Sequence, residues 1–211
     1  MKVREVVVYK HYFEDFFKEQ NRKVQDKIIK VLDILEQVER VPSTYLKYIE
    51  GTNGLFEVRV QSGNNIFRIF CCFDGNKLVV LFSGFQKKTQ KTPPGEIARA
   101  ERIMTEYYNE KTRTMDNTQT LDQLKDKYYG KVGTPERNRL ENELEALRIG
   151  YKIRTARESQ NLTQEQLAER VDKKRPFISK IENDGENITL RTLYDIVERG
   201  LGGRLKITFE F

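Results

Sequence analysis

The hydrophobic pattern of this chain changes half way along, and that change constrains its fold more than any other feature. The first half alternates between strand-length apolar runs and helical periods, whereas the second half has a helical pattern almost throughout. A polar stretch at 110–120 separates them and shows no periodicity, which is typical of a linker. A chain of 211 residues has room for two small domains, so two domains of different class are predicted.

The first half has the pattern of an α+β domain, with a largely antiparallel meander of strands packed on helices. Short turn sequences around Gly63 and Gly75 are of the length that joins strands as hairpins. Helical periods precede and follow the three consecutive strands. The predicted strands cover 3–8, 55–61, 65–73 and 77–84, and the predicted helices cover 12–40, with a break near Asn21, and 95–110.

The second half has the pattern of an all-α domain. Thr134 and Pro135 are typical of the cap and first residue of a long helix. The predicted helices cover 136–160, 163–170, 174–183 and 189–199, and an alternating stretch at 204–209 predicts an edge strand. We therefore divide the chain into a first domain, a linker with one helix, and a helical domain that ends in a strand, at 1–112, 113–135 and 136–211.

Composition excludes several classes of protein. No apolar run reaches the roughly 20 residues of a membrane-spanning helix, and no signal-peptide core follows Met1, so a soluble cytoplasmic protein is expected. The adjacent Cys71 and Cys72 and the single histidine, His11, offer neither a zinc site nor a nucleophilic triad. We therefore expect no metal and no cofactor.

Positive charge is concentrated in the first half. Residues 1–114 contain 20 basic and 15 acidic residues, a net of +5, out of +6 for the whole chain. An excess of this kind favours a polyanionic partner for the first half, although a well-solvated surface would show the same excess.

The second half contains a helix-turn-helix pattern between Leu162 and Asn183. Thr163 can cap its first helix, and a helix beginning near Arg175 would fit the major groove of DNA, with neighbouring cations on the phosphates. The pattern resembles the Cro/repressor-like (XRE) family over about 150–200. Asp172 and Lys173 depart from it, because the family places a glycine and an apolar residue there. The predicted DNA-binding residues are Thr163, Gln164, Lys173, Lys174, Arg175, Ser179, Lys180 and Asn183; a helical packing unit without DNA contact is the alternative.

The first half contains a basic face. If Gly63 and Asn64 form a two-residue hairpin turn, Arg59 lies directly opposite Arg68 on the same side of the sheet. Like charges in that position repel each other, so an anion between them is expected. The alternative is that Arg59 and Arg68 are surface cations that pair with a carboxylate such as Glu57. Three further cations follow the last strand of the meander at Lys87, Lys88 and Lys91.

The same residues carry a family resemblance. The runs GLFEVR (54–59), FRIF (67–70) and GFQKKTQKTP (84–93) resemble the HigB-type, phage-derived branch of the RelE/ParE toxin superfamily over about 1–110. That resemblance implies a small metal-independent ribonuclease that cuts messenger RNA on the ribosome. It also implies a HigA-type antitoxin with an XRE helix-turn-helix, which 115–211 resemble; whether the chain is a natural fusion or two joined polypeptides stays open.

The resemblance also implies roles for individual residues. Arg68, with Lys88 or Lys87, would contact the scissile phosphate, and Arg59 and Lys91 would hold the flanking backbone. Tyr107 and Tyr108 are candidates for proton transfer, but core positions or contacts with the antitoxin part would account for them too. His11 is expected at the surface or as a helix cap.

Together these patterns predict a type II toxin–antitoxin protein. The toxin part would bind messenger RNA and the ribosome, and the antitoxin part would dimerise on a palindromic operator and repress its own promoter. Antitoxin helices at 119–129 and 136–160 would pack on the toxin part and obstruct its RNA face. A non-catalytic transcriptional repressor and a ParE-like gyrase poison are the two alternatives.

Overall fold

The computed structural model describes residues 2–75, 78–88, 91–111, 117–185 and 188–208. The chain divides into two compact units, Met1–Arg137 and Asn138–Phe211, and each is described by itself. The first unit is α+β and the second is helical, as the sequence predicts.

The N-terminal unit is built on a mixed sheet with the strand order β2-β3-β4-β5-β1-β6. The predicted meander of β3, β4 and β5 is confirmed, and β1 lies parallel to β5 at its side. The sequence analysis missed two strands of three residues each, β2 and β6. The strands are β1 (Glu5–Tyr9), β2 (Leu46–Tyr48), β3 (Leu55–Ser62), β4 (Asn65–Asp74), β5 (Leu78–Lys87) and β6 (Thr118–Thr120).

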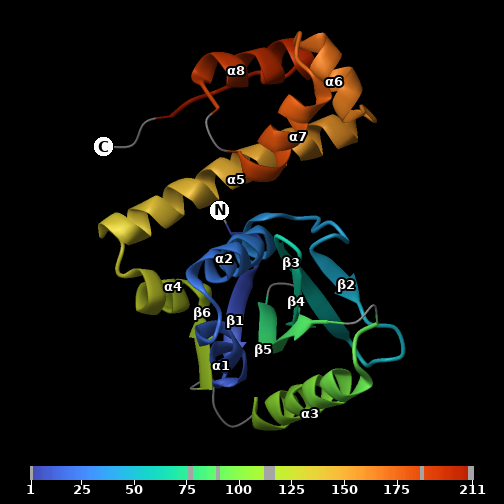
Figure 1. The fold of residues 1–211 in the computed structure, drawn as a ribbon, viewed down its shortest axis with the longest axis vertical. Coiled ribbons are helices and arrows are strands. Elements are labelled where there is room, and N and C mark those ends of the chain that lie inside the picture. Colours follow the sequence, from blue (N-terminus) through green and yellow to red (C-terminus); the bar gives the residue numbers. More distant parts are fainter. Residues whose placement is uncertain (1, 76–77, 89–90, 112–116, 186–187, 209–211) are drawn as a thin grey trace. The chain divides into compact units, whose positions relative to one another are not determined.

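Helices cover both faces of this sheet (Figure 1). Helices α1 (Tyr12–Lys18) and α2 (Arg22–Gln37) pack on one face, through β5 and β3 respectively. The break predicted near Asn21 is a helix boundary, since the Asn21 side chain caps α2 by accepting a hydrogen bond from the Val24 amide at 3.1 Å. Helix α3 (Pro94–Glu110) packs on the other face.

Alternating residues of the strands supply the two core layers. On the α3 face, Phe70, Val80 and Phe82 pack with Ala100 and other residues of α3. On the α1 face, Gly84 allows Phe16 to approach the sheet, because a Cβ at Gly84 would lie 2.3 Å from the Phe16 ring. The predicted core of that face, namely Val58, Val60, Phe67, Ile69 and Cys71, is buried, whereas Phe56 is only partly buried.

A bulge interrupts the pairing of β4 with β5. Ile69 lies opposite Gly84, but Cys71 lies opposite Leu81, so β5 has an additional residue at this point. The additional residue reverses the alternation along β5. As a result Phe85 and Lys87, rather than Gly84 and Gln86, continue the face that carries Phe82.

The stretch predicted as a linker belongs partly to the sheet. Helix α3 ends at Glu110, and Thr118–Thr120 form β6, which pairs antiparallel with β1. Helix α4 (Leu121–Tyr129) follows at once and begins with a capping box between Thr120 and Gln123. The expected linker is therefore too long, because pairing with β1 satisfies the backbone of three of its residues.

Helix α4 packs on the α1 and α2 side of the N-terminal unit. The Tyr129 hydroxyl donates to Asp26 at 2.8 Å, and the Arg22 guanidinium lies 3.6 Å from the centre of the Tyr129 ring. The Tyr128 hydroxyl donates to Glu14 at 2.8 Å. The helix predicted at 119–129 is thus confirmed, and so is the prediction that it packs on the first part of the chain.

The C-terminal unit is a set of short helices packed on one long helix. An apolar core joins them, and it includes Ile153, Leu167, Ile178, Ile181 and Ile196. The elements are α5 (Pro135–Ser159), which begins in the N-terminal unit, α6 (Gln164–Arg170), α7 (Arg175–Asp184), α8 (Leu190–Tyr194) and the π-helical turn η2 (Asp195–Gly200).

The predicted C-terminal strand is wrong for the described residues 204–208, which form no strand. Phe209, the last residue of the prediction, lies outside the described residues. The physical reason is the absence of a partner, since the described residues of this unit include no strand with which 204–208 could pair.

Within the described ranges, no helix is both long enough and apolar enough to cross a membrane.

Candidate functional site

Five charged residues lie together on the α3 face of the sheet, next to the part that α3 covers, and we call them the basic cluster. Four are cations and one is a carboxylate. Arg59 pairs directly with Arg68, as the hairpin register predicts, and Lys47 of β2 lies opposite Glu57 of β3. The cluster consists of Lys47, Glu57, Arg59, Arg68 and Lys87.

Glu57 lies between the two arginines. Its Oε1 atom is 2.9 Å from Arg59 Nε and 3.5 Å from Arg68 Nε. Its Oε2 atom accepts a hydrogen bond from the Thr92 hydroxyl at 3.1 Å. The carboxylate is 6% exposed, so it is an internal counter-ion. The alternative explanation for the two facing arginines, that they pair with Glu57, is thus correct in geometry. However, one carboxylate serves two guanidinium groups, so a net positive charge remains.

Arg68 is buried without a full set of hydrogen bonds. Its residue exposure is 9%, its Nη1 donates to the Phe67 carbonyl at 2.9 Å, and its Nε has no hydrogen-bond partner. Burial lowers the pKa of Arg68, Glu57 opposes that effect and Arg59 adds to it. A buried guanidinium with spare donors in a positive field is suited to binding an anion.

Lys87 lies within the electrostatic field of the two arginines and Glu57. Burial lowers the pKa of Lys87, and the charges of Arg68 and Arg59 lower it further while Glu57 raises it. The bulge in β5 explains why Lys87 rather than Lys88 turns toward Arg68, because the additional residue shifts the alternation by one. Lys88 and Lys91 lie after the strand and are exposed.

The structure places the candidate proton-transfer residues away from the cluster. The Tyr107 hydroxyl donates to Asp74 at 2.5 Å, and Tyr108 donates to the Phe73 carbonyl at 3.3 Å. Asp74 lies six residues beyond Arg68 on β4, which corresponds to about 20 Å along a strand. Tyr107 is a core residue, so the alternative of a core position is correct for it. His11 is exposed and precedes α1 without capping it through its side chain.

Sequence reasoning missed Lys47, a member of the basic cluster, and Thr92, which donates a hydrogen bond to Glu57 of that cluster. Lys47 escaped because β2 is only three residues long and has no alternating apolar pattern. Thr92 escaped because its hydroxyl reaches Glu57 from the connection before α3, which no local pattern reveals.

The helix-turn-helix has the predicted spacing. Thr163 caps α6, its Oγ1 accepting from the Gln166 amide at 3.1 Å, and Gln166 completes a capping box. Asp172, where the XRE pattern has glycine, adopts the left-handed conformation with φ of 52°. Aspartate tolerates that conformation better than most side chains, so the turn is preserved despite the departure.

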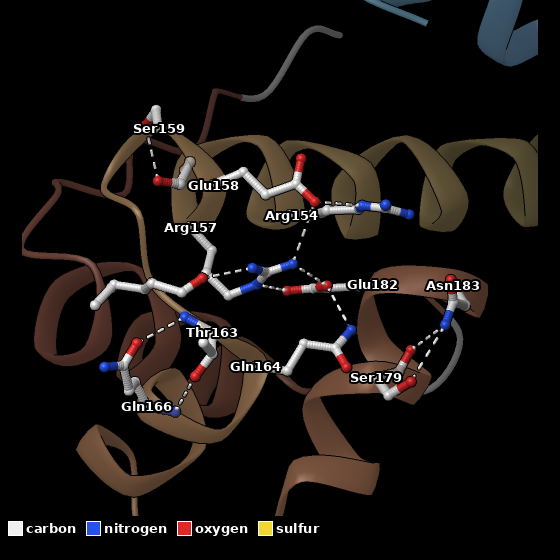
Figure 2. A network of polar contacts seen from close by, with 12 residues as sticks. Arg154, Arg157, Glu158, Ser159, Thr163, Gln164, Gln166, Ser179, Glu182 and Asn183 are labelled. Carbon is white, nitrogen blue, oxygen red and sulfur yellow. Dashed lines mark hydrogen bonds and ion pairs between the residues drawn. The ribbon is translucent and has the colours of Figure 1, made fainter. Parts of the chain in front are cut away.

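A buried ion pair fixes α7 against the end of α5 (Figure 2). Arg157 Nε and Nη2 donate to the two carboxylate oxygens of Glu182 at 2.6 and 2.9 Å. Arg157 Nη1 donates to the Leu162 carbonyl at 2.6 Å, and Gln164 Nε2 donates to Glu182 Oε2 at 2.9 Å. Gln164, a predicted DNA-binding residue, therefore also has an internal structural contact.

The other predicted DNA-binding residues lie mostly at the surface. Lys173, Lys174 and Arg175 are exposed at the start of α7, where the helix dipole adds positive charge. Further along α7, Lys180 is exposed, and the exposed Asn183 donates to the Ser179 carbonyl at 2.8 Å (Figure 2). This arrangement can place cations on phosphates and polar groups near base edges.

Comparison with known protein families finds two matches in this chain. Residues 15–105 match the family described as Phage derived protein Gp49-like, and residues 153–199 match the family described as Helix-turn-helix. A search of curated proteins finds no significant match. The chain therefore joins a Gp49-like domain, of a RelE/HigB-like toxin family, to an XRE-type helix-turn-helix domain.

Proposed function

We propose that this chain is a type II toxin–antitoxin protein. Its Gp49-like part would be a metal-independent endoribonuclease that cuts messenger RNA on the ribosome. Its helix-turn-helix part would be the antitoxin, which binds operator DNA and represses its own promoter. The observation that carries the proposal is the under-neutralised pair of the partly exposed Arg59 and the buried Arg68, in a Gp49-like domain that continues into a helix-turn-helix.

The proposed reaction uses groups that RNA itself supplies. The 2′-oxygen attacks the adjacent phosphorus, the bond from phosphorus to the 5′-oxygen breaks, and the products carry a 2′,3′-cyclic phosphate and a 5′-hydroxyl. The proton of the 2′-hydroxyl leaves to a base, and the 5′-oxygen gains one. The protein would orient the strand and stabilise the negative charge that develops on the phosphate oxygens.

The basic cluster is suited to that task. Arg68 has unused donor capacity beside a hydrogen-bonded Glu57, so a phosphate can bind without leaving the carboxylate unpaired. We assign Arg68 and Lys87 to the scissile phosphate, because the β5 bulge puts both on one face. Arg59, Lys88 and Lys91 would hold the flanking backbone.

The proposed antitoxin part begins with the segment 117–137, which packs on the toxin part. This segment completes the sheet edge at β1 and packs α4 on the α1 and α2 side. The basic cluster lies on the opposite, α3 face, so the expectation that helix 119–129 obstructs that face is wrong. The corresponding expectation for the 136–160 helix stays a prediction.

Expression in bacterial cells tests the proposal. Residues 1–114 should arrest growth and produce transcripts ending in cyclic phosphates, whereas the full chain should not. Arg59→Ala combined with Arg68→Ala should abolish both effects. Arg99→Ala with Arg102→Ala, which removes two exposed cations from α3, should leave them unchanged.

The alternatives give different results. A non-catalytic repressor predicts that residues 1–114 are harmless at a level where the protein is soluble and folded. A gyrase poison predicts DNA damage with transcripts intact. Growth arrest that persists in the Arg59→Ala, Arg68→Ala variant would refute the site assignment.

A further inference from the structure

Phe85 of β5 is an aromatic residue at the border of the basic cluster, and the proposed reaction assigns it no role. It lies directly opposite Arg68 in the pairing of β4 with β5, and Lys87 follows two residues further along β5. Side chains that lie directly opposite each other on one face have Cβ atoms about 4.5 to 5.5 Å apart. Because Phe85, Arg68 and Lys87 share the α3 face, the ring lies beside the cations assigned to the scissile phosphate.

The core supports the Phe85 ring, which nevertheless keeps some accessible surface. The ring stacks on that of the fully buried Phe70, with 5.6 Å between the two centres and 23° between the two planes. Ile97 of α3 packs against the same core, and Phe85 itself is only partly buried. Within the described ranges, Phe70 is the one ring in contact with Phe85, and no cation lies over it. The ring is therefore held by the core but open to a further stacking partner.

We propose that Phe85 stacks on a nucleobase of the RNA strand whose phosphate binds Arg68 and Lys87. The inference rests on the proposed function and deepens it, because it adds a base contact to a site that otherwise holds only the sugar-phosphate backbone. Proteins that bind single strands combine cations along the backbone with aromatic rings on which bases stack. Since Phe70 already holds the ring in place, stacking would cost little further ordering of the protein.

This ring changes the class of ligand that the basic cluster selects. Cations alone bind any polyanion, including a duplex, whose bases stack on one another inside the helix. A nucleotide in a single strand joins a flat π-face to a phosphate, so it can contact the ring and the cations together. Phe85 beside Arg68 would thus favour an unpaired stretch of RNA over a duplex and over polyanions without bases.

Binding of short single strands to the full-length protein tests the stacking. One dye-labelled probe is a 2′-O-methylated RNA of about six nucleotides, and the other is an abasic strand of the same length and charge. Methylation blocks the attacking 2′-oxygen, so the RNA probe is not cleaved. In fluorescence anisotropy, the wild type should bind the RNA probe about tenfold more tightly than the abasic probe. Phe85→Leu should remove that difference by weakening only RNA binding, whereas Phe85→Tyr keeps a ring and should bind like the wild type.

Two further variants separate stacking from charge and from general effects on the fold. Arg68→Met should weaken binding of both probes, because both carry the phosphates that the cation binds. Phe56→Leu is the matched control and should weaken neither, because Phe56 is a partly buried ring that precedes Glu57 on β3 and so faces the other side of the sheet. Every variant retains the cations of the helix-turn-helix, so any binding by that unit is the same in each comparison.

Three results would overturn the stacking: a wild type that binds both probes equally, a Phe85→Leu variant with unchanged affinity for the RNA probe, or an Arg68→Met variant that binds both probes like the wild type. Failure of the proposed ribonuclease gives a different result, namely intact transcripts in cells that make residues 1–114. Because the RNA probe cannot be cleaved, its binding reports the stacking whether or not the protein cuts RNA.

Discussion

Arg68 in the N-terminal unit and Arg157 in the C-terminal unit are both buried, at 9% and 7% exposure, but their surroundings differ. Arg157 donates to both carboxylate oxygens of Glu182 and to the Leu162 carbonyl. Glu182 also accepts a hydrogen bond from the neutral Gln164 amide. Arg68 shares Glu57 with Arg59, and its Nε has no hydrogen-bond partner.

The difference separates a structural cation from one available to a ligand. A buried charge that is fully paired holds elements together, and removing one partner leaves the other charge uncompensated. A buried charge that is only partly satisfied gives little stability in the free protein and can gain from an anionic ligand. The same side chain therefore fixes a fold in one unit and forms a candidate phosphate site in the other.

The largest expected effect comes from Arg157→Met. It would leave the buried Glu182 carboxylate with Gln164 but without its cation, and we expect a loss of about 3–5 kcal/mol in the free energy of unfolding. Urea unfolding followed by circular dichroism measures the loss, and hydrogen exchange locates it in the C-terminal unit. Arg154→Met, which breaks an i,i+4 pair with Glu158, should cost about 0.5 kcal/mol at most.

The exposed cations of α7 extend the comparison between structural and ligand-binding cations. We expect them to contribute to DNA binding and little to the stability of the fold. Replacing Lys174 and Arg175 by serine should weaken binding to duplex DNA about tenfold or more. It should also reduce the slope of log affinity against log salt by up to about 2. Fluorescence anisotropy at several salt concentrations measures both. A slope equal to that of Arg139→Ser with Arg154→Ser would count against α7 as the DNA-contacting helix.

Arg68→Met applies the same substitution to the other buried arginine. Glu57 would keep Arg59 and Thr92 as partners, so we expect a change in unfolding free energy within about 1 kcal/mol of zero. The same urea measurement serves as the readout. A loss as large as that of Arg157→Met would show that Arg68 is structural and would remove the contrast between the two sites.

The smallest effect concerns another carboxylate that several cations share, Asp122 of α4. Burial would raise its pKa, but hydrogen bonds from Lys2 and Lys125 outweigh burial and lower the pKa to about 2. A folded pKa below the unfolded value gives stability that is present above about pH 4 and is lost as the pH falls toward 2. Because the side chain is half exposed, solvent screening should keep the contribution below about 1 kcal/mol.

Asp122→Asn should therefore lower stability slightly at pH 7 and reduce the loss between pH 4 and pH 2. Urea midpoints at these three pH values provide the measurement. An unchanged pH dependence would show that the ion pairs around α4 do not stabilise its attachment to the N-terminal unit.

Local patterns predicted most of the elements correctly. The break at Asn21, the hairpin at Gly63 and the opposition of Arg59 to Arg68 follow from capping and turn chemistry, which act over a few residues. The helix-turn-helix was also predictable, because its caps and apolar spacing are local. Even Asp172 in place of glycine kept the turn.

Contacts between distant segments decided the rest. The bulge that turns Lys87 toward Arg68 depends on how β5 meets β4, so the sequence analysis named Lys88 first, with Lys87 as its alternative. Strand β6 exists because β1 offers it a partner, whereas the strand-like residues 204–208 have none among the described residues. The alternation of side chains along a strand can be predicted from the sequence, because it depends only on neighbouring residues. Strand pairing, register and the partners of a buried charge depend on contacts between segments that are distant in the sequence.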